Sequence, residues 1–268
     1  MHPRSGMDPL APLLNRTLVL VAHPDDESIS CGALLQRVRE PIVVYATDGG
    51  PQDEYFWGRY GSREKYVAIR RAEAHDACAA VGVSEVLWLA DDAGCQFQDQ
   101  RLFRNLPAAA DALRKLVRQH TPDVILTLAY EGGHPDHDSC NFLGRQIADE
   151  CSLLAWEAPL YFRKGGDDIL LQEFHSTNGT EIEFVPTAEE LRRKRTMCEA
   201  YVSQQGTVAI FENNLRETFR PMARYDYSRP PHDGVLNYEA WQWPIKGQQV
   251  ADKFMEYLQG APRAESAR

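Results

Sequence analysis

The chain has 268 residues, of which 43% are hydrophobic and 25% are charged. These fractions are typical of a folded globular protein and exclude a disordered or fibrous chain. With 29 Lys and Arg residues against 39 Asp and Glu residues, the formal net charge is −10, which disfavours binding to nucleic acid and to anionic membranes.

The chain offers no segment typical of export or of membrane spanning. Residues 1–17 lack the basic region and apolar run of a signal peptide, and the apolar run 18–22 is too short to cross a bilayer. The six cysteines include no Cys-x-x-Cys pair, as in proteins whose thiols stay reduced. We therefore expect a cytoplasmic protein without a membrane span, either a monomer or a homo-oligomer.

Short apolar runs alternate with helical patterns in the first 130 residues. The predicted strands are 17–22, 42–47, 85–90 and 123–129, and the predicted helices are 28–39, 63–80 and 105–117. Strands that are apolar on both faces are typical of the centre of a parallel sheet. The alternation predicts an α/β fold, a Rossmann-like three-layer α/β/α sandwich with a mainly parallel sheet.

The rest of the chain is less regular. Further strands are predicted at 153–161, 169–175 and 182–185, a helix at 188–202, and an irregular packed cover at 219–244, which is rich in Pro, Tyr and Trp. No linker marks a second domain. We expect a single domain over residues 1–268, with a core of about 16–200 and an irregular C-terminal extension of about 201–268.

Two segments rich in His and Asp follow the first and fourth predicted strands. They are Ala-His-Pro-Asp-Asp-Glu at 22–27 and Glu-Gly-Gly-His-Pro-Asp-His-Asp at 131–138. Loops that follow parallel strands meet at one edge of the sheet, where ligands bind. Two imidazoles and one carboxylate hold zinc in hydrolases and iron in oxygenases, and they leave positions open for water and substrate. The two segments therefore predict a catalytic metal centre.

The direction of the side chains limits the roles within these segments. Asp25 and Asp26 are neighbours and point different ways, so one can bind the metal while the other acts as a base. His134 and His137 are three residues apart at a predicted helix start, so one can be a ligand with the other beside it. Taken singly, His-Pro-Asp is also typical of a turn followed by a helix cap, and a lone His-x-x-His is often incidental. Their coincidence at two strand ends favours the metal centre.

The segments AHPDDE (22–27) and HPDH (134–137) together resemble the signatures of the PIG-L/LmbE-like metal-dependent de-N-acetylases. Further matches are Thr47-Asp48-Gly49-Gly50, Arg70-x-x-Glu73 and Gly82-Val83, so the resemblance covers about the first 150 residues. It implies the LmbE-like sandwich and the removal of an N-acetyl group, as acetate, from an N-acetylglucosamine-type sugar. The substrate would be a small molecule or a glycoconjugate.

The resemblance also implies roles for the residues of the two motifs. His23, Asp26 and His137 would bind one metal ion, usually Zn²⁺ in this family, with Fe²⁺ or another divalent ion as alternatives. Asp25 would be the general base, and His134 would act opposite to it.

Other roles are implied outside these five residues. Arg70 would contact the sugar or its aglycone, although Arg70 and Glu73 are equally typical of an ion pair on a helix surface. Asp48 and Asp92 would contact hydroxyl groups of the substrate. Asp136 would stand outside the ligand shell and orient His134.

Two features of the sequence depart from this pattern or lie outside it. A mycothiol-pathway relative has a tyrosine two residues before the first His of HPDH, assigned to oxyanion stabilisation, where this chain has Gly132. The donors for an oxyanion, beyond the metal and His134, therefore stay open. Aromatic residues around Trp241 and Trp243 offer faces for a sugar ring, but near-alternate spacing favours ordinary packing.

Two other functions compete with deacetylation. A non-haem Fe(II) oxygenase uses the same set of two His and one carboxylate, but it usually presents His-x-Asp on an antiparallel fold, whereas this chain has His-x-x-Asp and strand–helix alternation. A non-catalytic carbohydrate-binding relative would keep the fold alone. The complete motif set argues against simple binding, because binding does not need a base beside an open metal position.

Overall fold

The central feature of the computed structural model, which describes residues 8–166, 168–211 and 215–260, is a mostly parallel sheet. Its parallel strands are β1 (Arg16–Val21), β2 (Glu40–Tyr45), β3 (Glu85–Trp88), β4 (Val124–Leu128) and β5 (Leu154–Ala158). They lie in the order β3-β2-β1-β4-β5. Strand β9 (Glu217–Pro221) pairs with β5 in the antiparallel direction, and β8 (Ile182–Phe184) pairs with β9.

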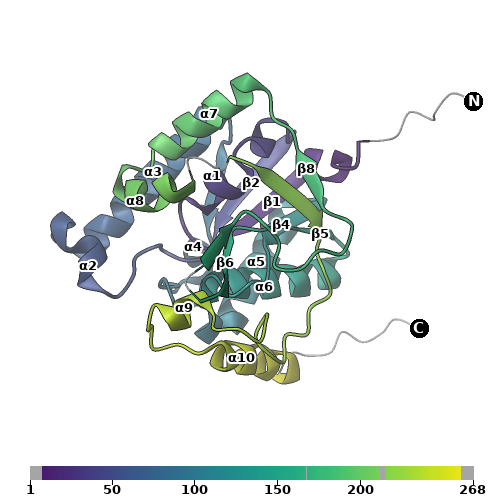
Figure 1. Cartoon of the computed structure of the whole chain (residues 1–268). Helices are drawn as coiled ribbons and strands as arrows, with labels where there is room; N and C mark the ends of the chain where they lie inside the picture. Colours follow the sequence, from purple (N-terminus) through teal and green to yellow (C-terminus); the bar gives the residue numbers. More distant parts are fainter. Residues whose placement is uncertain (1–7, 167, 212–214, 261–268) are drawn as a thin grey trace, which may run out of the picture.

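Helices cover both faces of this sheet (Figure 1). One face packs against α1 (Asp26–Cys31), α3 (Arg63–Val81) and α7 (Ala188–Glu199), and the other against α5 (Leu106–His120), α6 (Pro135–Cys151) and α10 (Gly247–Gly260). Strand β1 serves both cores, because Val19 and Val21 face the first set and Leu18 and Leu20 the second. The predicted three-layer α/β/α fold is confirmed.

Shorter elements connect these layers. They include the short helices α2 (Glu54–Trp57), α4 (Leu89–Ala93), α8 (Gln205–Val208) and α9 (Asn237–Ala240), and the hairpin of β6 (Tyr161–Gly165) and β7 (Asp168–Leu171). The described residues also form short 3₁₀ turns: η1 (Ala11–Leu14), η2 (Leu34–Gln36), η3 (Gly58–Tyr60), η4 (Leu102–Arg104), η5 (Val202–Gln204) and η6 (Ala209–Phe211). Among the described residues, no helix is both long and apolar enough to cross a membrane. Residues 1–7, 167, 212–214 and 261–268 of the predicted single domain lie outside the described part, and the domain assignment stays a prediction.

The helix predicted at 28–39 is wrong in length. Helix α1 ends at Cys31 and gives way to the 3₁₀ turn at Leu34–Gln36. The amides of Ala33 and Leu34 donate to the carboxylate of Glu217 at 2.7 and 2.9 Å instead of to a carbonyl one turn back. A distant side chain on β9 therefore ends the helix, which local periodicity does not encode.

Two other predictions at the sheet need correction. The strand predicted at 85–90 stops at Trp88, because the chain turns into α4 at Leu89. The segment 219–244, predicted to be irregular, shares residues with β9, which pairs with β5 and β8. Apolar and polar residues alternate only weakly in this segment, so its sequence does not predict the strand β9.

Lys194 and Glu217 form a buried ion pair that joins α7 to β9, with Nζ and Oε1 2.8 Å apart. We expect Lys194→Met to lower the free energy of unfolding by about 3 kcal/mol, because it leaves a buried carboxylate without its cation. Urea denaturation measures this loss. The control Lys253→Met breaks an exposed pair with Glu256 and should cost less than about 1 kcal/mol. Equal small losses in both variants would contradict the prediction.

Candidate metal centre

Parallel pairing of β1 and β4 brings the two motifs together. Thr17 of β1 lies opposite Val124 of β4, so the two strands end at the same edge of the sheet. His23 follows β1, and His134 and His137 stand at the start of α6, which follows β4. All three imidazoles are buried. The two segments therefore lie together, as the sequence predicted.

The three predicted ligands converge on a common point, His23 and His137 through one ring nitrogen each and Asp26 through its two carboxylate oxygens. The Nδ1 atom of His23 lies 3.2 Å from Nε2 of His137 and 3.4 Å from Oδ2 of Asp26. The Nε2 atom of His137 lies 3.3 Å from Oδ1 of Asp26. Ligand atoms of a tetrahedral zinc ion with bonds of about 2.0–2.1 Å are separated by about 3.3 Å. These residues therefore fit a small divalent cation, which would sit among the three side chains.

The Asp26 carboxylate is held in its ionised form. Its Oδ2 atom accepts hydrogen bonds from the backbone amides of Ala22 and His23 at 3.2 and 2.8 Å. Burial by itself raises the pKa of this group, but the imidazoles of His137 and His23 lower it more, and the net pKa is well below the usual value. An ionised, pre-oriented carboxylate is what a metal ligand requires.

Asp25 is placed differently from its neighbour, as the sequence predicted. Its backbone has φ 142°, a region that non-glycine residues rarely adopt and that costs about 1–3 kcal/mol. Its side chain makes no hydrogen bond that caps α1, which leaves the helix-cap interpretation of this motif without support. Instead the carboxylate lines the pocket beside the three imidazoles. Burial raises the pKa of Asp25 to about 7, against the opposing charge of Arg70.

Arg70 of α3 reaches the same loop from the other side. Its Nη2 atom lies 3.1 Å from Oδ2 of Asp25 and donates to the carbonyl of Pro24 at 2.6 Å. Its Nη1 atom donates to the carbonyl of Gly49. Arg70 is buried and does not pair with Glu73, which instead accepts from Ser203. The guanidinium therefore positions Asp25 and the two loops, and its contact with a sugar stays a prediction.

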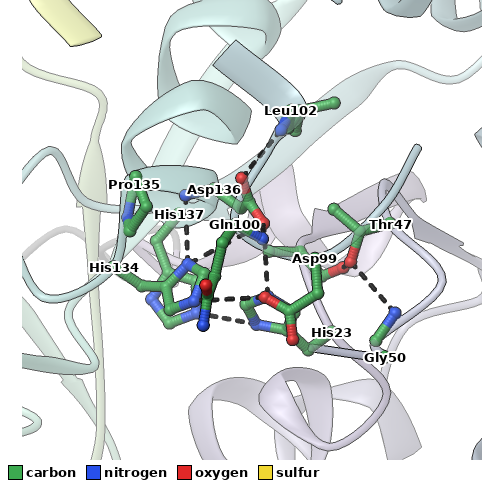
Figure 2. Close-up of polar contacts among 12 residues, drawn as sticks. His23, Thr47, Gly50, Asp99, Gln100, Leu102, His134, Pro135, Asp136 and His137 are labelled. Atoms are coloured by element: carbon green, nitrogen blue, oxygen red, sulfur yellow. Dashed lines mark hydrogen bonds and ion pairs between the residues drawn. The ribbon is translucent and has the colours of Figure 1, made fainter. Parts of the chain in front are cut away.

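His134 lies beside the three ligands, and its hydrogen bonds define its tautomer. Its Nδ1 atom accepts from the backbone amide of Asp136 at 3.1 Å, so the proton of the neutral ring is on Nε2. That Nε2 atom faces Oδ1 of Asp99 at 3.3 Å (Figure 2). His134 is also within reach of the ion-binding group of His23 and His137. Because its Nδ1 atom already accepts a hydrogen bond and its Nε2 atom faces Asp99, we assign the ligand role to Asp26 instead.

Asp99 is the main site residue that the sequence analysis missed. Its Oδ1 atom lies 3.2 Å from Nε2 of His23 and 3.3 Å from Nε2 of His134, so it bridges the outer sides of two imidazoles. Burial raises its pKa, but the two rings lower it more, and the net pKa is well below the usual value. Asp99 follows α4 in an irregular loop without a motif, and its position depends on how that loop folds back over the site.

The carboxylate of Asp136 does not orient His134 as predicted. Its two oxygens accept from the backbone amides of Gln100 and Leu102 at 2.5 and 2.9 Å, and Oδ2 lies 3.9 Å from Nδ1 of His134. The backbone amide of Asp136, not its side chain, fixes His134. The carboxylate instead ties the loop that carries Asp99 to α6 (Figure 2).

Two predicted substrate contacts lie away from the site. Asp92 on α4 pairs with Lys115 of α5, and it is not among the residues that line the pocket over the metal centre. Asp48 is held by Arg63 at 2.6 Å and accepts from the amides of Gly50 and Asp99, so its carboxylate braces two loops. Neither carboxylate faces the pocket, and we correct both assignments.

A pocket of about 370 Å³ opens over the metal centre, a size that suits a small ligand. Its polar floor consists of the imidazoles and carboxylates described above. Its walls are aromatic: Trp243 contacts the ring of His134 edge-on with centroids 5.1 Å apart, and Trp241 lies next to Trp243 at 5.3 Å. The tryptophans of the C-terminal extension thus reach the site, beyond the ordinary packing that the sequence favoured.

Comparison with known proteins agrees with this geometry. Residues 18–148 match the family model described as PIG-L, GlcNAc-PI de-N-acetylase. A probable N-acetyl-alpha-D-glucosaminyl L-malate deacetylase 2 of Bacillus cereus is 30% identical over 146 residues, which cover 52% of this chain and 62% of the relative. A 2'-N-acetylparomamine deacetylase of Streptomyces fradiae is 33% identical over 138 residues, covering 46% of this chain and 48% of the relative.

The chain spans about half to three-fifths of the length of these relatives. Among solved structures, the deacetylase of the pseudoaglycone of the antimicrobial reagent A40926 superposes with a TM-score of 0.62 at 20% identity. The superposition covers 79% of this chain and 98% of that one. At 20% identity this superposition shows that the two proteins share a fold. The matched segment contains both motifs and every candidate metal ligand. Residues 18–148 of this chain, just under half of its length, therefore match the PIG-L family.

Proposed function

We propose that the protein is a metal-dependent hydrolase that removes the N-acetyl group of an N-acetylglucosamine-type sugar and releases acetate. The observation that carries this proposal is the combination of three ligand residues, whose nearest nitrogen and oxygen atoms lie 3.2–3.4 Å apart, with a separate buried carboxylate, Asp25, beside them. A binding protein does not need such a base, and a structural metal site would not leave a pocket open beside it. The names of the relatives support the class of substrate.

Zinc is the metal we propose for this site. Two neutral imidazoles and one carboxylate suit Zn²⁺, and Fe²⁺ or another divalent ion is the alternative. When bound, the ion would lower the pKa of a water in its open position and polarise the acetamido carbonyl. The remaining chemistry belongs to side chains of the protein.

Asp25 would act as the general base. As the water oxygen adds to the acetamido carbon, its proton passes to the Asp25 carboxylate, whose raised pKa makes it a better acceptor than an ordinary aspartate. Arg70 holds the carboxylate in place through its contact at 3.1 Å. The carbonyl π electrons move onto oxygen and form a tetrahedral oxyanion.

His134 would act on the opposite side of the reacting carbon. Its Nε2–H is a donor at the edge of the pocket and faces Oδ1 of Asp99 at 3.3 Å. Collapse of the tetrahedral species breaks the C–N bond, and a proton delivered by Asp25 or His134 leaves with the sugar nitrogen. The products are acetate and the free amine.

The non-haem oxygenase alternative finds less support in the fold. The ligands project from the ends of parallel strands in a three-layer sandwich, whereas such oxygenases use an antiparallel barrel. Consumption of oxygen with an oxo-acid cosubstrate would favour the oxygenase over the deacetylase. The non-catalytic alternative leaves the strained backbone and placement of Asp25 without a purpose.

The mouth of the pocket favours a substrate with an apolar aglycone. Phe56 of α2, Ile210 of η6 and Trp241 after α9 line it from three directions, and they are 39%, 60% and 44% exposed. Exposed apolar side chains that converge on one opening mark a binding surface. We propose that the sugar lies over the metal centre and that its aglycone contacts these three residues.

We expect Asp25→Asn to retain the metal and to lose roughly 10²- to 10⁴-fold in kcat, because the amide cannot accept the proton. Acetate release and elemental analysis of the purified variant measure the two quantities. The control Asp111→Asn changes an exposed aspartate on α5 and should leave both unchanged. Turnover near that of the wild type in Asp25→Asn would remove Asp25 from the role of base.

His137→Ala should lose the metal itself, since it deletes one of three ligand atoms. Zinc content per chain should fall from about one toward zero, and added zinc should no longer raise Tm as it does for the wild type. His75→Ala, which removes an exposed imidazole on α3, provides the control. Full metal content in His137→Ala would refute the ligand assignment.

Trp241→Ala should raise KM about 3- to 10-fold for an alkyl or aryl glycoside of N-acetylglucosamine, because apolar contact area is lost. Its KM for the methyl glycoside should change little, and kcat should stay the same for both. Val185→Ala removes an exposed apolar side chain elsewhere and is the matched control. Equal effects on both glycosides would contradict an apolar aglycone site.

A further inference from the structure

Hydrolysis of an amide creates an oxyanion that needs a hydrogen-bond donor aimed at it. The loop before His134 supplies no side chain for this purpose, since Gly132 and Gly133 stand there. The amide of Gly132 donates to Asp138 at 3.0 Å and is therefore already used. Besides the Nε2–H of His134, a further donor would come from another element.

The structure explains why glycine occupies both positions. Gly132 has φ +73°, and a Cβ there would lie 2.6 Å from Cδ2 of Leu236 in the C-terminal extension. A Cβ on Gly133 would lie 2.2 Å from the carbonyl oxygen of Tyr161 and 2.9 Å from its ring. The absence of a side chain at Gly132 leaves room for the C-terminal extension, and its absence at Gly133 leaves room for Tyr161.

Tyr161, the first residue of β6, is fixed against the metal centre by three contacts. The carboxylate of Glu131 accepts from the backbone amides of Leu160 and Tyr161 at 2.8 and 2.9 Å. The Tyr161 ring packs edge-on to His137, with centroids 5.5 Å apart, and it also lies over Gly133. This phenol side chain lines the pocket.

The hydroxyl of Tyr161 has the properties of a donor kept for a ligand. Within the described part of the chain, no residue makes a hydrogen bond to it. The Tyr161 side chain lines the same pocket as Asp25, Asp26 and Asp99, so its hydroxyl is available to a ligand bound there.

We propose that the hydroxyl of Tyr161 donates a hydrogen bond to the oxygen of the acetamido carbonyl and holds it as it becomes an oxyanion. Tyr161 is then a catalytic residue that touches the substrate, opposite Asp25 across the reacting carbon. The tyrosine keeps its proton throughout, and no bond to it is made or broken. This inference rests on the proposed deacetylase function.

The test is Tyr161→Phe, which removes only the hydroxyl and keeps the ring on His137. We expect kcat for acetate release to fall about 10²-fold or more, with KM within about twofold of the wild type and the zinc content unchanged. The matched control is Tyr55→Phe, the same change at a side chain that is 86% exposed, which should leave kcat as it was.

A binding measurement provides a readout apart from turnover. The zinc-loaded protein is titrated with a sugar that carries a methylphosphonamide in place of the acetamide, a mimic of the tetrahedral oxyanion. Tyr161→Phe should weaken this binding by a factor similar to the loss in kcat, while glucosamine, the amine product, binds as before.

Two results would overturn the assignment of Tyr161. Wild-type kcat and analogue affinity in Tyr161→Phe would remove the hydroxyl from the reaction, while the proposed function stands. Equal weakening of analogue and amine would make Tyr161 a packing residue. No acetate release by the wild type from any N-acetylated sugar would instead reject the proposed function, and this inference with it.

Discussion

The structure depends on the placement of several buried carboxylates among three imidazoles at one edge of the sheet. Asp26, Asp99 and Asp136 all lie within 3.6 Å of His23. Such a density of negative charge is costly in a protein interior unless a cation offsets it. A divalent ion bound by His23, Asp26 and His137, as we propose, would offset this charge. His134 also caps α6 by accepting from the backbone amide of Asp136, so this segment combines a helix cap with the proposed metal centre. The surrounding loops are arranged to hold these groups in spite of their repulsion.

Backbone atoms do much of that work. Amides of Ala22 and His23 bind Asp26, amides of Gln100 and Leu102 bind Asp136, and the amide of Asp136 binds His134. Except for Gln100, which lies in a turn, these donors stand at a strand end or a helix start, so the side chains are oriented before any ligand arrives. The strained backbone of Asp25 belongs to the same arrangement, because it turns one carboxylate away from the metal ligands and toward Arg70.

The segments after residue 150 complete the pocket. Tyr161 begins a hairpin, Ile210 belongs to a 3₁₀ turn and Trp241 follows a short helix, yet all three line the same opening. Leu236 packs against Gly132 and Tyr161 packs against Gly133, so both residues contact the loop that leads to His134. The polar floor of the pocket comes from residues 18–148, and the later segments form its apolar walls together with Phe56. A division of this kind lets one reaction centre serve substrates with different aglycones.

The sequence by itself determined the parallel strands and the meeting of the two motifs, because short stretches of chain encode both. Apolar runs such as Thr17–Ala22 and Val124–Leu128 predicted the parallel strands, and the two motifs at their ends predicted that His23, Asp26 and His137 meet, because parallel strands must end at one edge. Folding in three dimensions decided the rest. Glu217 ended α1 from a distant strand, Asp99 entered the site on an irregular loop, and Asp48 and Asp92 were engaged by Arg63 and Lys115. These outcomes depend on contacts between residues far apart in the chain, and no local periodicity or spacing records them.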